Sequence, residues 1–357
     1  MKERKIEINK DVAVDANSLV EQINLCPFIL SFSGQGFDWI SMLRSTLKDG
    51  VQNDVKAVIA HAAKMLEPVV DQLDHYRPDG FAPVLWAQSS SVHVDLLQAA
   101  VSVPGIFVSQ IANLKALQKK GLNIESATGC IGHSQGILGC YLLNDLSQVV
   151  PLLAIAELIG VAASYYGKAN NMVIKDGLYP MVMIQNFKIE DLQLTIDTLF
   201  PEELTDDLVR PCVGLINSRS AAVITGQPEA VKKVCDALVA ELPLTDNQSL
   251  EHIIFPLEVE VAFHHPSLSA AVAQVVDWAE TCGIDSEQAG MIARHVLIEP
   301  VNWVKQCQHT LDQGAAYILE IGPSGGVAAL TEDILKNEDI TVLDISGEEG
   351  KERLFDK

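Results

Sequence analysis

The segment 127–143, ATGCIGHSQGILGCYLL, restricts the fold of this chain more than any other feature. A short apolar run precedes Gly132, and an apolar stretch with helical character follows Gly136. Glycines on either side of Ser134 let the backbone turn tightly, so that the hydroxyl is held out between a strand and a helix. The segment therefore predicts a strand, a sharp turn and a helix in an α/β fold, with Ser134 as the candidate nucleophile.

A second strand and glycine turn precede this segment. Residues 27–33 (PFILSFS) predict a buried strand that ends at Gly34-Gln35-Gly36, and a helix follows from Asp38 to Leu47. Long helices are expected over 52–72, over 91–120 with an interruption near Pro104, and over 150–167.

The pattern of expected strands and helices changes from residue 180 onward. Strands are expected at 180–186, 211–218, 221–226 and 257–263, with one helix after the first strand and another after the third. This β-α-β-β-α-β order is typical of a ferredoxin-like unit. We therefore divide the chain into an α/β body, formed by 1–177 and 263–357, and an inserted subdomain at 178–262. Three helices (266–281, 285–296 and about 301–313) and a strand (316–322) complete the body.

Charge and cysteine content exclude several classes of protein. The chain has 25 Lys and Arg against 47 Asp and Glu, a formal net charge of −22, which repels phosphate backbones and argues against nucleic acid as a partner. Its seven cysteines form no CxxC pair and are odd in number, which argues against a disulfide framework. The first residues contain no apolar signal region, and no window reaches about 18 uninterrupted apolar residues. We expect a cytoplasmic protein that does not span a membrane.

A serine nucleophile needs a base, and the chain has nine histidines from which to choose. Most of them lie in polar helical or loop segments, where a solvated side chain is the simpler interpretation. His133 adjoins Ser134, and neighbours on a tight turn point apart, so a packing role is expected for it. His264 and His265 follow the expected strand 257–263 directly, and a strand end is a rigid place from which to present a base.

Five short motifs stand in the order found in acyl-CoA:acyl carrier protein acyltransferases: FSGQG (32–36), GHSQG (132–136), NSRSAAVITG (217–226), FHHP (263–266) and EIGP (320–323). They resemble the FxGQG, GHSxG, N-x-VISG, FHS and GPG elements of that family over about 27–330. The sequence around these motifs is similar, more specifically, to the N-terminal acetyl or acyltransferase region of bacterial type I fatty acid synthases. The resemblance implies an α/β-hydrolase-like body with a parallel central sheet and an inserted ferredoxin-like subdomain.

The resemblance also implies roles for individual residues. Ser134 would be acylated with His264 as its base, and the backbone N–H groups of Gln35 and Gln135 would form an oxyanion hole. Asn302 is the candidate that orients His264; a capping role is the alternative for it.

Three positions depart from the family pattern. His265 stands in place of a serine and Ser324 in place of a glycine, with effects that the sequence does not define. Malonyl-specific relatives carry an Arg on the helix after the turn, where this chain has Ile159, 25 residues after Ser134. A buried malonyl carboxylate would then lack a counter-charge, so we expect a neutral acyl group, acetyl first of all.

The implied reaction moves an acyl group from acyl-CoA to the phosphopantetheine thiol of an acyl carrier protein, priming fatty acid or polyketide synthesis. It needs no metal and no tightly bound cofactor, and other domains of a fatty acid synthase are possible partners. The anionic substrates need a local cation, and the candidates are Lys115, Lys119, Lys120, Arg219, Lys232 and Lys233, each equally consistent with a solvated surface side chain.

Two alternatives remain open. G-x-S-x-G also marks serine hydrolases and thioesterases of the α/β type, although there the His lies near the end of the fold, whereas 93 residues follow His264 here. The other alternative is a non-catalytic docking domain of a megasynthase, which the presence of both Ser134 and His264 disfavours.

Overall fold

The computed structural model of the chain describes residues 18–36, 38–241, 253–323 and 326–355. Its main sheet has four parallel strands in the order β2-β1-β8-β9. They are β1 (Phe28–Phe32), β2 (Gly129–Gly132), β8 (Tyr317–Ile321) and β9 (Thr341–Asp344). Strands β1 and β2 therefore end side by side, and the two glycine turns that follow them lie at the same edge of the sheet.

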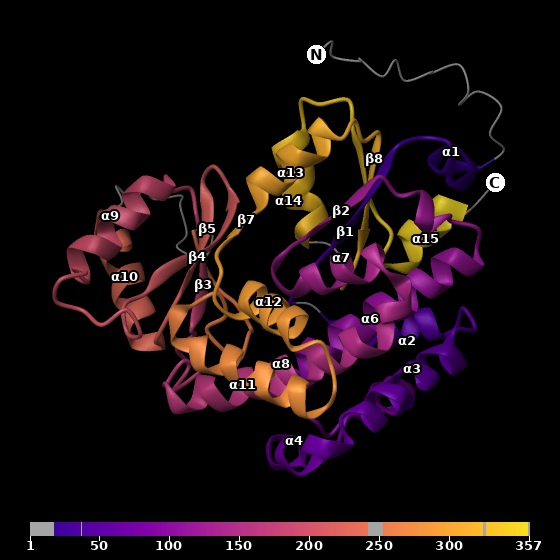
Figure 1. Cartoon of the computed structure of the whole chain (residues 1–357). Coiled ribbons are helices and arrows are strands. Elements are labelled where there is room, and N and C mark those ends of the chain that lie inside the picture. Colours follow the sequence, from indigo (N-terminus) through magenta and orange to yellow (C-terminus); the bar gives the residue numbers. More distant parts are fainter. Residues whose placement is uncertain (1–17, 37, 242–252, 324–325, 356–357) are drawn as a thin grey trace.

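Helices cover both faces of this sheet (Figure 1). On one face, Leu30 and Phe32 pack into a core with α2 (Trp39–Leu47), α6 (Ala99–Lys119), α7 (Ile137–Asn144) and α8 (Val149–Ala169). On the other face, Ile29 packs with residues of α13 (Trp303–Asp312) and α14 (Gly326–Leu335). Every residue of β1 is buried, as expected for a parallel strand covered on both sides.

The remaining helices surround this layered body. They are α1 (Leu19–Asn24), α3 (Gln52–Met65), α4 (Val70–Tyr76), α5 (Pro83–Gln88), α11 (Ser269–Thr281), α12 (Ser286–Leu297) and α15 (Glu348–Phe355). The expected helix 52–72 is thus two helices, α3 and α4, joined by a short 3-10 turn at Glu67–Val69.

The predicted interruption near Pro104 was wrong, because α6 runs through it. Pro104 lacks the N–H that would bond the carbonyl of Ala100. That carbonyl instead accepts a hydrogen bond from Arg77 Nη1 at 3.3 Å. Arg77 is itself buried and paired with Glu157 of α8, with Nη2 to Oε2 at 2.7 Å. A side chain from outside the helix therefore satisfies the group that proline leaves open.

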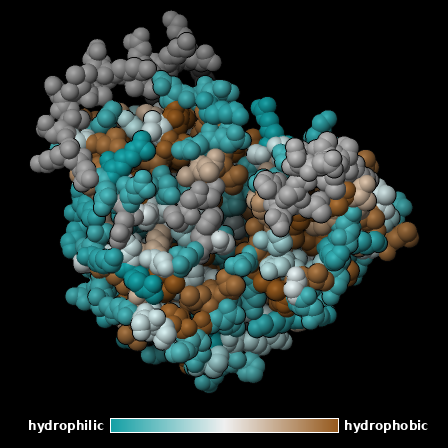
Figure 2. Space-filling model, turned by 180° about the vertical axis from the view of Figure 1, so that it is seen from behind, coloured by the Kyte–Doolittle hydropathy of each residue, from teal (hydrophilic) through white to brown (hydrophobic). Residues whose placement is uncertain are grey.

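Two helical segments, Ala99–Lys119 and Leu146–Ala169, are long and apolar enough to cross a membrane by length and composition. In this fold they are interior helices: 94% of the first window and 67% of the second are buried. They pack against each other under the main sheet. Figure 2 shows the face opposite to that of Figure 1, where hydrophilic residues are interspersed with apolar ones.

A second sheet lies beside the main body, at the left of Figure 1. Its order is β6-β3-β5-β4-β7, and its strands are β3 (Met181–Gln185), β4 (Cys212–Ser218), β5 (Ala221–Thr225), β6 (Ile254–Pro256) and β7 (Val301–Asn302). Helices α9 (Ile189–Leu199) and α10 (Pro228–Glu241) pack on it around a core of their own. The antiparallel order of β3 to β6 and the two helices confirm the ferredoxin-like pattern. The sequence did not predict β7, which comes from the body and pairs in parallel with β4.

The expected strand at 257–263 was wrong, because the fourth strand of the subdomain is β6, immediately before it. Within 257–263 only an isolated bridge forms, between Val173 and Val261. The Glu260 carboxylate accepts hydrogen bonds from Ala99 N at 2.6 Å and Ser164 Oγ at 2.8 Å. The alternating apolar residues of this segment therefore pack over α6 and α8 instead of joining a ladder.

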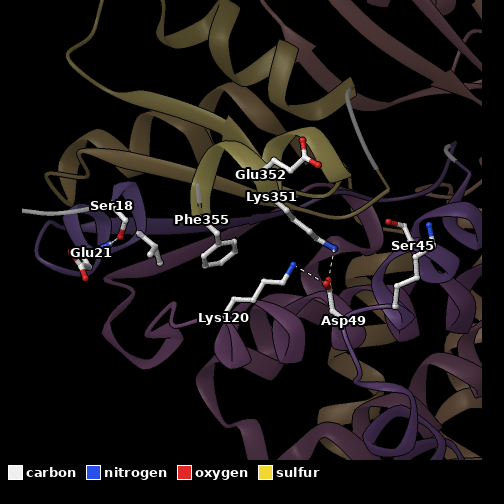
Figure 3. Close-up of a pocket in the computed structure, with 10 residues that line it drawn as sticks. Ser18, Glu21, Ser45, Asp49, Lys120, Lys351, Glu352 and Phe355 are labelled. Carbon is white, nitrogen blue, oxygen red and sulfur yellow. Dashed lines mark hydrogen bonds and ion pairs between the residues drawn. The ribbon is translucent and has the colours of Figure 1, made fainter. Parts of the chain in front are cut away.

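Helix α15 lies on the side of the body away from the second sheet (Figure 1), and Figure 3 shows the residues that surround a cavity beside it. Lys351 Nζ donates to Thr46 Oγ1 at 2.9 Å, and Asp49 pairs with Lys120 at 2.7 Å and with Lys351 at 3.8 Å. Asp49, Lys120 and Lys351 line a cavity of about 710 Å³ between α15 and the ends of α2 and α6. None of the residues expected to be catalytic lines it.

Candidate active site

Ser134 occupies a strained turn between β2 and α7. Its φ is +56°, in the left-handed region that non-glycine residues rarely adopt. The neighbouring glycines make this turn possible: a Cβ on Gly136 would lie 2.0 Å from the carbonyl oxygen of Phe32, and one on Gly132 would lie 2.5 Å from Ile137 N. Any larger residue at either position would push the turn away from the sheet. The predicted strand, turn and helix are present, and the Ser134 side chain reaches a cavity.

The structure brings His264 to Ser134, with Oγ and Nε2 2.7 Å apart. The other ring nitrogen, Nδ1, is 2.7 Å from the backbone carbonyl oxygen of Glu299. A carbonyl can only accept, so Nδ1 carries the hydrogen and the lone pair of Nε2 faces the serine hydroxyl. This is the tautomer that a general base needs.

The inserted subdomain holds the backbone of the base in place. Thr225 Oγ1, on β5, donates to the carbonyl of Phe263 at 2.7 Å. Gly214, on β4, leaves room for the base, since a Cβ there would lie 3.2 Å from the Cβ of His264. His264 itself has φ +59°. Ser134 therefore comes from the main body, and the subdomain supports its base, so the site lies between the two sheets.

The environment of His264 keeps its imidazole neutral. Burial lowers its pKa to about 4; the hydrogen bond to the Glu299 carbonyl opposes this shift, and nearby His133 adds to it. The neutral form is therefore present above a pH of about 4 and is lost only as the pH falls through that value. At neutral pH the ring is ready to accept the serine proton.

The low pKa of His264 predicts an unusual pH profile. A histidine with an ordinary pKa near 6.5 would lose about tenfold of its neutral fraction between pH 7.5 and pH 5.5. We expect the rate of Ser134 acylation in single-turnover experiments to change less than about twofold over this range. A tenfold decrease by pH 5.5 would contradict the described environment of the base.

Asn302 does not orient the base, contrary to our expectation. Its side chain begins α13, where Oδ1 accepts from Lys305 N at 3.0 Å. This is the capping role that the sequence left open for it. The Glu299 carbonyl, three residues earlier, takes the place next to Nδ1. Every residue carries a carbonyl, so no sequence signal could have identified this one.

The first glycine turn lies directly against the nucleophile. A Cβ on Gly34 would be 2.8 Å from the carbonyl oxygen of His133 and 2.9 Å from the Cβ of Ser134. Gln35 follows at once and lines the same cavity as Ser134, while Gln135 is the middle residue of the short 3-10 helix Ser134–Gly136. Both residues expected to supply oxyanion N–H groups are thus adjacent to Ser134. Their role as donors stays a prediction.

The cavity at Ser134 has a volume of about 430 Å³ and is mostly apolar. Its apolar lining includes Met181, Met183, Leu215, Val259, Phe263 and Leu330. Among the described residues that line it, none is Lys, Arg, Asp or Glu. Ile159 is fully buried in α8 and is not among the residues that line the cavity, and its effect on acyl choice stays a prediction.

His133 connects the nucleophile turn to the inserted sheet. Its Nε2 lies 2.9 Å from Asn217 Oδ1, on β4, and its ring meets that of Trp303 edge to face at a centroid distance of 5.2 Å. Burial lowers the pKa of His133, and the Asn217 hydrogen bond opposes this shift. His133 therefore has the packing role expected for it and also joins the two halves of the site.

Two of the three departures from the family pattern are His265, which follows the segment 257–263, and Ser324, which comes after β8 in the chain. His265 is fully buried, with Nδ1 2.9 Å from Ser267 Oγ and Nε2 2.9 Å from the carbonyl of Arg210. It points away from Ser134 and stabilises the turn that carries His264. Ser324 lies outside the described residues. Within the described ranges, no group of three or more His, Cys, Asp or Glu could hold a metal ion.

Solved structures of similar fold support this arrangement. An MCAT from Streptococcus pneumoniae matches with a TM-score of 0.65 and 18% identity, covering 92% of this chain and 99% of the other. A malonyl-transacylase in complex with a type II PKS acyl-carrier protein matches with a TM-score of 0.68 and 20% identity, covering 93% and 100%. At these identities the likeness establishes the fold, and it confirms the predicted acyltransferase architecture.

Curated relatives are much longer than this chain. The mycoketide-CoA synthase of Mycobacterium tuberculosis is 22% identical over 88% of this chain and 7% of its own length. The fatty acid synthase subunit beta of Gibberella zeae is 24% identical over 70% of this chain and 14% of its own. The chain thus spans a small part of each of these relatives.

A family model described as starter unit:ACP transacylase in aflatoxin biosynthesis matches residues 30–252. The match takes in the last three residues of β1 and its glycine turn, the whole nucleophile segment and the inserted subdomain as far as α10. These are the elements that place Ser134 and support the turn of His264. Since the match covers more than half of the chain, the protein belongs to the starter unit:ACP transacylase family.

Proposed function

We propose that this chain transfers a neutral acyl group, with acetyl as the first candidate, from CoA to the phosphopantetheine thiol of an acyl carrier protein. The observation that carries the proposal is the contact of Ser134 Oγ with His264 beside an apolar cavity. The imidazole of His264 is neutral, and the Glu299 carbonyl orients it. Membership in the transacylase family supports the same reaction class.

The first half of the reaction acylates Ser134. His264 Nε2 accepts the hydroxyl proton as Oγ attacks the thioester carbonyl. The N–H groups of Gln35 and Gln135 then stabilise the negative charge that develops on the carbonyl oxygen. CoA leaves as its thiol, taking the proton from His264, and the acyl-serine ester remains.

The second half repeats these steps with a new nucleophile. The phosphopantetheine thiol of the carrier gives its proton to His264 Nε2 and attacks the ester, and Ser134 leaves with that proton. Water must be kept from the ester between the two halves. The apolar side chains of the cavity, such as Met183 and Phe263, favour this exclusion.

A neutral acyl group fits the cavity better than an acidic one. A carboxylate buried there would lose its hydration without a Lys or Arg among the described lining residues to replace it. This argument rests on the lining as a whole and does not depend on Ile159.

The chain matches a small part of much longer synthases, which supports a place beside other catalytic domains, to which it supplies a starter unit.

The charge of the acyl group provides the test. We expect acetyl-CoA and butyryl-CoA to load Ser134 faster than malonyl-CoA by a factor of about 30 to several thousand, which corresponds to about 2–5 kcal/mol for an unpaired buried charge. Butyryl is close to malonyl in size, so this pair separates charge from volume. The measurement is the rate of mass gain of the intact protein with each thioester.

Two outcomes would count against the proposal. Faster loading by malonyl-CoA would mean that a cation from outside the described lining reaches the cavity. Rapid release of free acid without transfer to a carrier thiol would instead favour the thioesterase alternative.

A further inference from the structure

The hairpin between β4 and β5 lies at the rim of the catalytic cavity. Ser218 pairs with Ala221, so Arg219 and Ser220 form a two-residue turn, and both are exposed. Asn217, just before the turn, lines the cavity, and so does Gln185, which pairs with Ala221. Two residues of extended chain span at most about 7 Å. Arg219 is therefore close to the cavity but outside its apolar interior.

Arg219 differs from the other cations that the sequence singled out. Lys120 is paired with Asp49, and Lys119 bonds the carbonyls of Asp49 and Gly50. On α10, Lys232 is paired with Asp236, and Lys233 lies over the ring of Phe200.

Lys115 lies in the C-terminal half of α6, and the chain after α6 passes Leu122 and Thr128 to reach the start of β2. The nucleophile turn follows the other end of β2, so Lys115 lies toward the opposite end of the sheet from Ser134. Arg219, in contrast, makes no ion pair or side-chain hydrogen bond with any described residue, and it alone of the six adjoins the cavity.

A second cation lies beside this hairpin. Phe187 N bonds the carbonyl of Ser220 at 3.4 Å, which brings the segment after β3 next to the turn. Lys188 belongs to that segment, is exposed and makes no ion pair with the described residues. Glu190 and Asp191 follow it in the first turn of α9 and reduce its positive field. Arg219 is therefore the stronger candidate of the two.

We propose that Arg219, at the tip of the β4–β5 hairpin, binds a phosphate group of the pantetheine-bearing substrate while the thioester lies at Ser134. The inference rests on the proposed function and assigns a binding residue for it. A planar guanidinium can donate two parallel hydrogen bonds to phosphate oxygens. In a chain of net charge −22, an arginine at the cavity rim that pairs with no described acidic residue also gives an anionic substrate a favourable point of approach.

The test compares substrates with and without phosphate. Acetyl-CoA and acetyl-pantetheine present the same thioester, but only the first carries phosphates. We expect Arg219→Ala to lower kcat/KM about tenfold with acetyl-CoA and less than twofold with acetyl-pantetheine. Arg219→Lys should recover part of the loss, and the difference from the wild type should shrink at high salt. Lys232→Ala, a charge removed elsewhere on the same subdomain, should leave both values unchanged.

The acceptor arm distinguishes the source of the phosphate. If Arg219→Ala slows acyl transfer to both CoA and a holo carrier protein, Arg219 binds the phosphate that these two acceptors share. If it slows transfer to CoA alone, Arg219 binds the nucleotide phosphates of CoA. An equal loss with acetyl-CoA and acetyl-pantetheine, or no loss with either, would overturn the inference. If the wild-type protein loads Ser134 from neither thioester, the proposed function itself fails.

Discussion

Ser134→Ala is expected to abolish formation of the acyl-enzyme. The variant loses the only atom at the nucleophile turn that can form the ester, and neither neighbour can replace it: His133 is bonded to Asn217, and Gln135 is buried. Removal of such a nucleophile costs about six orders of magnitude in a comparable serine enzyme. The measurement is the intact mass of the protein after incubation with acetyl-CoA, and we expect no gain for the variant.

Ser126→Ala serves as the matched control. It removes a serine hydroxyl that bonds the Asn123 carbonyl at 2.7 Å, outside the cavity. It should load like the wild type. Thermal unfolding of both variants checks that the fold is retained. Acetylation of folded Ser134→Ala at the wild-type rate would show that another residue is the nucleophile.

His264→Ala is expected to slow acylation by about two to four orders of magnitude, the usual contribution of a general base. The variant removes the acceptor that lies 2.7 Å from Ser134 Oγ and keeps the hydroxyl itself. Slow loading should remain, because the turn and the oxyanion donors are unchanged. Single-turnover loading with acetyl-CoA, followed by mass spectrometry, measures the rate.

The adjacent histidine supplies the control for this variant. His265→Ala removes the hydrogen bonds that its ring makes with Ser267 and with the Arg210 carbonyl, away from Ser134, so we expect a lower melting temperature but a loading rate much closer to that of the wild type. Rates are compared on the folded fraction of each variant. If His265→Ala is the inactive protein and His264→Ala keeps its activity, the base has been assigned to the wrong residue.

The sequence predicted those features of the fold that depend on local pattern. The glycines around Ser134 and after β1 are needed for close backbone contacts that no other residue allows, so their positions in the sequence indicate the turns. The β-α-β-β-α-β order was visible because each strand and helix has its own periodicity. The pairing of Ser134 with His264, 130 residues apart, came from the resemblance to a family and not from spacing.

Other features depend on tertiary contacts that leave no mark in the sequence. The segment 257–263 alternates like a strand, but Glu260 ties it to α6 and α8. Pro104 suggests a helix break, yet Arg77 satisfies the carbonyl that it leaves open. The orienting group of His264 is a main-chain carbonyl, and any residue could have supplied it. Whether Ile159 affects acyl choice depends on the cavity walls, which a sequence position alone does not define.

The central claim is that Ser134 carries an acyl group from CoA to a carrier thiol, and following one labelled acyl group through both half-reactions tests it most directly. The protein is incubated with labelled acetyl-CoA, freed of excess CoA, digested and analysed by mass spectrometry, before and after addition of a holo acyl carrier protein. We predict one acetyl group on the peptide that contains Ser134, which then disappears as the label is recovered on the phosphopantetheine thiol of the carrier. Label that never reaches Ser134, or that leaves it only as free acetate while the carrier stays unlabelled, would contradict the claim.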